Sequence, residues 1–149
     1  MSIGEICIRQ VVVATRETRI LEGAKLMRQY HVGDLVITEE SKGRRVPVGI
    51  VTDRDLVLEV LAEGLDPKEL SIGDVMVDEV LTVRESEGIF QTIQQMRAKG
   101  ARRVPVVNNE GELVGIVSVD DLLEILSGEL SELSKLMAVE QRREAEVRH

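Results

Sequence analysis

The stretch GIVTDRDL at residues 49–56 recurs 66 residues later as GIVSVDDL at residues 115–122. Both copies read Gly-Ile-Val, then a hydroxyl residue, two variable positions, Asp and Leu. An internal repeat of this length predicts two similar structural units rather than one irregular domain. The repeat therefore indicates the fold class before any single helix or strand is assigned.

The apolar pattern around each copy predicts the same order of elements, β-α-β-β-α. In the first copy we expect these five elements at residues 11–13, 18–30, 35–37, 47–51 and 53–63, with a polar turn at 39–46. In the second copy we expect them at residues 80–83, 86–99, 104–107, 113–117 and 119–126, with a hairpin turn at 108–111. Strands and helices alternate in this way in mixed α and β folds.

The repeat also divides the chain. Met27 and Met96 lie 69 residues apart whereas the Gly-Ile-Val copies lie 66 apart, so the first copy carries three extra residues in its hairpin, where loops tolerate insertions. We expect a first domain at residues 6–64, a second at 73–128 and a helical tail at 129–149.

The tail carries a narrow apolar stripe. Leu126, Leu130, Leu133 and Met137 follow one another at intervals of four, three and four residues, which is the spacing of one helix face. The stripe could pack on its own domain or on a partner chain, and we favour the partner. After Val139 most residues are charged, and we expect this end to fray into solvent.

Composition narrows the function. The chain has 149 residues, a net charge of −8, one Phe, one Tyr and no Trp, so we expect neither phosphate-backbone binding nor base stacking. One cysteine and two histidines are too few for a thiolate cluster or most zinc sites, and we expect no metal. No long apolar run or signal peptide is present, so we expect a cytoplasmic protein without a membrane span.

The hydroxyl and the carboxylate of each copy are three residues apart, at the end of a strand and the first turn of a helix. Asp55 and Asp121 could accept hydrogen bonds from a ribose diol, while Thr52 and Ser118 and the helix N-terminus could hold a phosphate. The glycines that begin each copy would let a ligand approach the strand closely. The same spacing also forms capping boxes, which stabilise helices without any ligand. Both interpretations remain open.

Over residues 6–128 the sequence resembles a tandem pair of CBS domains, an arrangement called a Bateman module. The family pattern, Gly-hydrophobic-x-Thr/Ser-x-x-Asp, matches both 49–55 and 115–121. Residues 102–107, RRVPVV, also resemble the family's strand on the adenine side of its ligand cleft. The first copy departs there, because residues 33–37 read GDLVI without proline, and its pocket is expected to differ.

The resemblance implies an α/β (α+β) fold of two β-α-β-β-α repeats with pseudo-twofold symmetry, plus a C-terminal helix. It implies clefts for AMP, ADP, ATP, NAD or S-adenosylmethionine as a regulatory ligand, and a homodimer. The site residues it implies are Thr15, Gly33, Asp34, Leu35, Thr52, Arg54, Asp55, Thr82, Arg103, Val104, Pro105, Ser118 and Asp121.

Two functions follow from these features. The first is a regulatory module that senses an adenosyl ligand and transmits it to a dimer or to a protein partner. The alternative is a structural homodimerisation module without ligand sensing. No nucleophile paired with a base, P-loop or catalytic zinc pattern is present, so we expect no enzymatic activity.

Overall fold

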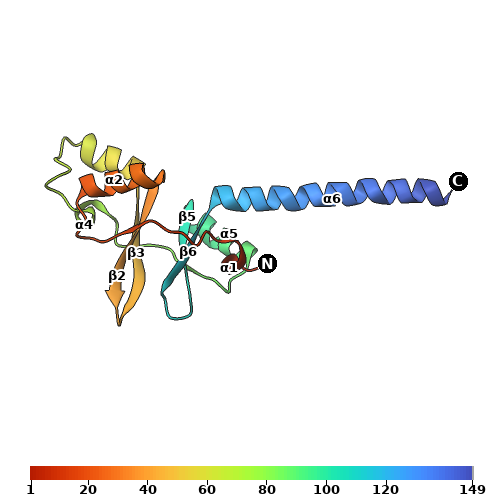
Figure 1. The fold of residues 1–149 in the computed structure, drawn as a ribbon, viewed down its shortest axis with the longest axis horizontal. Coiled ribbons are helices and arrows are strands. Elements are labelled where there is room, and N and C mark those ends of the chain that lie inside the picture. The colour runs from red at the N-terminus through yellow and green to blue at the C-terminus, as the bar shows by residue number, and fades with distance from the viewer. Residues whose placement is uncertain (149) are drawn as a thin grey trace. The chain divides into compact units, whose positions relative to one another are not determined.

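The computed structural model describes residues 1–148, so His149, the last residue of the predicted tail, lies outside the described residues. Over residues 1–148 the fold is mixed α and β, with two three-stranded sheets whose strands lie side by side in chain order (Figure 1). The chain divides into two compact units, residues 1–117 and 118–149. The predicted fold class is confirmed.

The predicted order β-α-β-β-α occurs twice. The first copy comprises β1 (Val13–Ala14), α2 (Ile20–Tyr30), β2 (Asp34–Ser41), β3 (Arg44–Thr52), α3 (Asp53–Leu56) and the π-helical turn η1 (Val57–Leu61). The second comprises β4 (Val83–Arg84), α5 (Ile89–Lys99), β5 (Arg103–Val107), β6 (Leu113–Ser118) and α6 (Val119–Val147). A short helix precedes each copy at the same interval of 69 residues, α1 (Ile3–Ile6) before the first and α4 (Ile72–Val75) before the second.

The hairpin of the first copy is longer than predicted. β2 and β3 pair from Asp34–Thr52 out to Ser41–Arg44, so the turn contains only Lys42 and Gly43. Both of these residues have positive φ, 53° and 76°. Positive φ at both positions is required in the two-residue hairpin turn whose twist matches that of the strands. The prediction of a turn over residues 39–46 was wrong, because polar residues can continue a pair of hydrogen-bonded strands where their side chains face solvent.

The first helix of each copy, α2 or α5, ends in a left-handed residue. His31 follows α2 with φ 55°, and Gly100 follows α5 with φ 65°. Glycine is the usual residue at such an end, and histidine takes its place in the first copy. Each helix buries its apolar face, including Met27 and Met96, which lie 69 residues apart. The helices therefore occupy equivalent places in the two copies.

The core of the first copy includes part of the connection between the copies. Ile72, on α4, is fully buried with Leu35, Ile37 and Val51. Met76, just after α4, is partly buried against the same cluster. The sequence analysis assigned no helix or strand between residues 63 and 80, because a four-residue helix has too little apolar periodicity to be recognised.

The chain ends in one continuous helix, α6, of 29 residues. The predicted boundary between residues 128 and 129 falls inside it, and the expected fraying after Val139 was wrong. Glu, Gln, Arg and Ala dominate this end and favour helix, and Arg148 forms an ion pair of 2.8 Å with Glu144 one turn before it. Among the helices that the structure describes, none is long and apolar enough to cross a bilayer.

Candidate functional site

The unit formed by residues 1–117 contains a cavity of about 570 Å³, a size typical of small-molecule sites. Residues of the first copy, of the connection after α4 and of the segment entering β5 form its walls. The lining residues are Ile50, Thr52, Asp53, Arg54, Asp55, Glu59, Val75, Met76, Val77, Glu79, Val80, Leu81, Ala101, Arg102 and Arg103. The cavity thus brings four residues predicted from sequence, Thr52, Arg54, Asp55 and Arg103, to one place.

The first copy's hydroxyl and carboxylate form a capping box at the start of α3. The Asp55 backbone N–H donates to Thr52 Oγ1 at 3.1 Å, and the Thr52 backbone N–H donates to Asp55 Oδ2 at 2.9 Å. A carboxylate has a second oxygen, so Asp55 Oδ1 remains for a donor from a ligand. Helix capping and ligand binding are therefore compatible roles for Asp55.

The second copy repeats the box at the start of α6. Asp121 N–H donates to Ser118 Oγ at 3.1 Å, and Ser118 N–H donates to Asp121 Oδ2 at 3.3 Å. A third Ser-x-x-Asp, Ser71 and Asp74, makes the same backbone bond of 2.9 Å at the start of α4, and this bond lowers the pKa of Asp74. Neither Ser71 nor Asp74 lines the cavity. Capping alone is therefore no evidence of a binding site.

An ion pair joins the two copies beside the cavity. The Arg103 guanidinium contacts Asp34 Oδ2, and the Asp34 side chain is only 17% exposed. Burial raises the pKa of Asp34, the nearby Asp53 carboxylate raises it further, and Arg103 opposes both. The pairing thus holds a carboxylate whose charged form is disfavoured by its surroundings.

Comparison with known proteins identifies the family. The CBS domain profile matches residues 3–62 and 72–128, which is most of the chain. The chain belongs to the CBS-domain family. Hypoxic response protein 1 of Mycobacterium tuberculosis is 33% identical over 122 residues, covering 82% of this chain and 78% of that protein.

Two further proteins are similar to this CBS pair. Uncharacterized protein MK0525 of Methanopyrus kandleri is 36% identical over 125 residues, or 84% of this chain, and the match spans only 62% of that protein. The CBS domain pair of protein MJ0100, solved with 5′-methylthioadenosine and S-adenosylmethionine, is 26% identical with a TM-score of 0.74, and the match covers 87% of this chain and 98% of that one.

The remaining residues implied by the CBS resemblance do not line the cavity. Leu35, Val104 and Pro105 have fully buried side chains, so only their backbone atoms could reach a ligand. Thr15 and Thr82 also lie outside the cavity lining; the Thr15 backbone N–H and hydroxyl are hydrogen-bonded to Thr18 Oγ1 at 3.1 and 3.3 Å. Gly33 and Asp34 lie close by: the Asp53 backbone N–H donates to the Gly33 carbonyl at 2.9 Å, and Asp34 is paired with Arg103.

The glycines that begin the two CBS motifs do not leave room for a ligand. A Cβ built on Gly49 would meet the tip of Met76, and one on Gly115 would meet Cys7 and the Ile8 carbonyl. The expectation of a close ligand approach at these strands was therefore wrong. The protein's own segments after α4 and α1 occupy the space instead.

Sequence reasoning missed the cavity wall contributed by residues 75–81 and the carboxylates Asp53, Glu59 and Glu79. The wall could not be found locally, since a connection approaches a site only in the folded chain. Arg102 also lines the cavity and could have been predicted, because it precedes Arg103 in the segment that resembles the family's strand. No group of three potential metal-ligating side chains occurs among residues 1–148.

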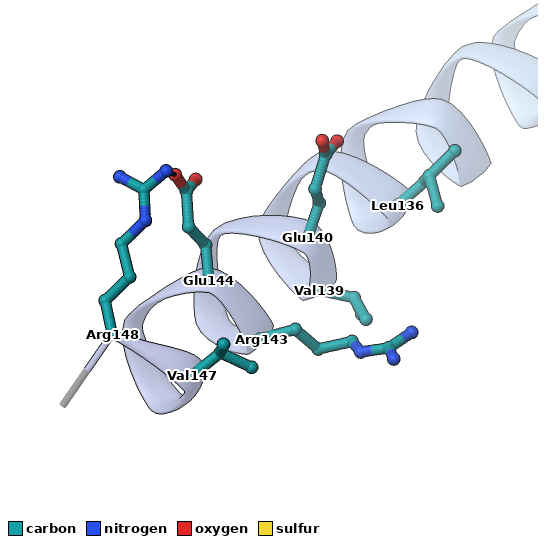
Figure 2. Close-up of a pocket in the computed structure, with 7 residues that line it drawn as sticks. All are labelled: Leu136, Val139, Glu140, Arg143, Glu144, Val147 and Arg148. Atoms are coloured by element: carbon teal, nitrogen blue, oxygen red, sulfur yellow. Dashed lines mark ion pairs between the residues drawn. The ribbon is translucent and has the colours of Figure 1, made fainter.

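A second hollow lies along the last turns of α6 (Figure 2). All of its lining residues belong to this one helix: Leu136, Val139, Glu140, Arg143, Glu144, Val147 and Arg148. Figure 2 shows the guanidinium of Arg148 reaching the carboxylate of Glu144 along the helix surface. A hollow with a wall on one side only cannot enclose a small molecule, so it is no candidate for a small-molecule site.

Proposed function

We propose that this CBS pair is a non-catalytic regulatory module that binds an adenosyl ligand in the cavity near Thr52 and Asp55. Asp55 Oδ1 accepts a hydrogen bond from a ribose hydroxyl. Thr52 and the first turn of α3 face the polar end of the ligand. Because the walls come from both copies, the bound ligand bridges them. It favours whichever arrangement of the copies binds it more tightly, and so carries a signal to a partner.

The observation that carries this proposal is the convergence of the first copy's hydroxyl and carboxylate with Arg102 and Arg103 of the second copy around one cavity. The cavity volume suits a nucleoside, and apolar residues such as Ile50 and Leu81 offer surface for a base. The MJ0100 CBS pair with its two adenosyl ligands supports the same assignment.

A thermal-shift screen tests the proposal. The full chain is melted with AMP, ADP, ATP, NAD, S-adenosylmethionine and 5′-methylthioadenosine, with guanosine as the matched nucleoside control. A true ligand present at about 100 times its Kd is expected to raise Tm by roughly 5–10 °C, because it binds only the folded state. No shift with any adenosyl compound, or an equal shift with guanosine, would contradict the proposal.

The tail supports a second candidate function, homodimerisation through α6. Leu130, Leu133, Leu136 and Met137 are all more than half exposed on this helix. Residues 119–134 carry five acidic side chains and no basic one, whereas residues 135–148 carry four basic and three acidic. A parallel pair would place the two acidic halves together. An antiparallel pair with a second copy of the chain places each acidic half against a half that contains the arginines.

The variant Leu133→Glu tests this antiparallel pair. A charge in the middle of the apolar stripe is expected to raise the dimer dissociation constant at least about tenfold, measured by sedimentation equilibrium. Ser131→Glu adds the same charge to an exposed position outside the stripe and is expected to leave the dimer intact. If Ser131→Glu weakens association as much as Leu133→Glu does, the stripe is not the contact.

A further inference from the structure

The ion pair between Asp34 and Arg103 joins equivalent positions of the two CBS copies. The residues lie 69 apart, the same interval as Met27 and Met96, and each begins the strand that follows the first helix of its copy. The same position of the repeat therefore carries a negative charge in the first copy and a positive charge in the second. Asp34 thereby occupies one of the two guanidinium groups that the second copy contributes to the cavity.

The charges around the cavity are otherwise mainly negative. Four carboxylates line it, on Asp53, Asp55, Glu59 and Glu79, against three guanidinium groups, and the Arg103 guanidinium is paired with Asp34. A phosphate that binds Arg103 would have to displace Asp34 from it and would leave that half-buried carboxylate without its cation. It would also lie near the remaining carboxylates, whose repulsion is little screened inside a cavity.

We propose that Asp34, by holding Arg103, selects adenosyl ligands without a phosphate chain, such as a neutral thioether nucleoside or a cationic sulfonium. Such ligands leave the ion pair in place and add no negative charge to the cavity. This inference rests on the proposed function and makes Asp34 a specificity-determining residue that acts through Arg103.

Calorimetric titration of four ligands tests the proposal. The full chain is expected to bind 5′-methylthioadenosine and S-adenosylmethionine at least about tenfold more tightly than AMP or ATP. Asp34→Asn keeps the size of the side chain and removes its charge, which frees Arg103 for bidentate contact with phosphate. The variant is expected to bind AMP and ATP about tenfold more tightly than the original chain does, with little change for 5′-methylthioadenosine.

Two variants separate this mechanism from a general effect of charge. Glu59→Gln removes the same charge from the cavity wall but leaves the ion pair between Asp34 and Arg103 in place. It relieves part of the repulsion only, and is expected to improve AMP binding by less than about threefold, against about tenfold for Asp34→Asn. Arg103→Met added to Asp34→Asn is expected to abolish the gain for AMP and ATP. Circular dichroism and Tm show that each variant is folded before it is titrated.

The outcomes distinguish this inference from the function on which it rests. If none of the four compounds binds the original chain, the proposed function is wrong and the inference falls with it. If the original chain binds ATP as tightly as 5′-methylthioadenosine, or if Asp34→Asn and Glu59→Gln improve AMP binding equally, the adenosyl site stands and the selective role of Asp34 is wrong.

Discussion

Gly115→Ala is expected to destabilise the protein by about 2–3 kcal/mol, near the upper end for overpacking a tight contact. A Cβ at this position lies 2.6 Å from Cys7 Sγ and 2.9 Å from the Ile8 carbonyl oxygen. Ile8 is held by two backbone hydrogen bonds of 2.9 Å with Ile116, so the carbonyl cannot retreat without breaking a β-bridge. The added methyl therefore forces the N-terminal segment away from β6.

The equivalent glycine of the first copy provides the matched control. A Cβ on Gly49 meets the terminal methyl of Met76, a flexible side chain, and its nearest backbone atom is the Val77 carbonyl at 3.4 Å. Gly49→Ala is expected to cost less than about 1 kcal/mol, because Met76 can change rotamer. Urea denaturation of both variants measures the difference, and equal losses would show that the Ile8 contact is not the cause.

A double-mutant cycle with Cys7 separates the two contacts at Gly115. Burial raises the pKa of the Cys7 thiol, as expected for a packing residue, and Cys7→Ala removes the nearer of the two obstructing atoms. The Gly115→Ala penalty is expected to fall by about 1 kcal/mol in the Cys7→Ala background, since the Ile8 carbonyl remains. If the penalty vanishes entirely, the sulfur alone is responsible.

The sequence predicted most reliably those features that depend on neighbouring residues. The repeat at residues 49–56 and 115–122 indicated two strands that end in capping boxes, and both boxes are present. A capping box needs only a hydroxyl and a carboxylate three residues apart, so the local sequence is enough to predict it. Whether Asp55 also binds a ligand is not local, which is why capping and binding both remained open at that stage.

Features that join distant segments were beyond sequence reasoning. Asp34 and Arg103 were each named as site residues, yet nothing in either neighbourhood indicates that they pair with each other. The burial of Ile72 in the first core and the position of residues 75–81 at the cavity likewise depend on how the connection folds back. The left-handed conformation of His31 could not be predicted either, because this position is not a glycine.

Asp55→Asn is expected to weaken binding of the proposed adenosyl ligand about 10- to 100-fold while leaving the fold nearly as stable as before. The Asn side-chain oxygen can still accept the Thr52 N–H and preserve the capping box. Its amide group donates rather than accepts, so the charge-assisted bond to a ribose hydroxyl is lost, a contact of about 1.5–3 kcal/mol. Calorimetry with the ligand identified by thermal shift measures the affinity, and urea denaturation measures the stability.

The contrast with two alanine variants decides between the roles of Asp55. Asp55→Ala removes both the cap and the ribose acceptor, so it is expected to lose affinity as Asp55→Asn does and also to lower Tm. Asp74→Ala breaks the capping box at α4, outside the cavity lining, and is expected to lower Tm without changing affinity. If Asp55→Asn binds as tightly as the original chain, the carboxylate serves only to cap α3, and the ribose contact must come from another acceptor in the cavity. Affinity that falls in proportion to Tm across all three variants would show that ligand binding responds only to helix stability.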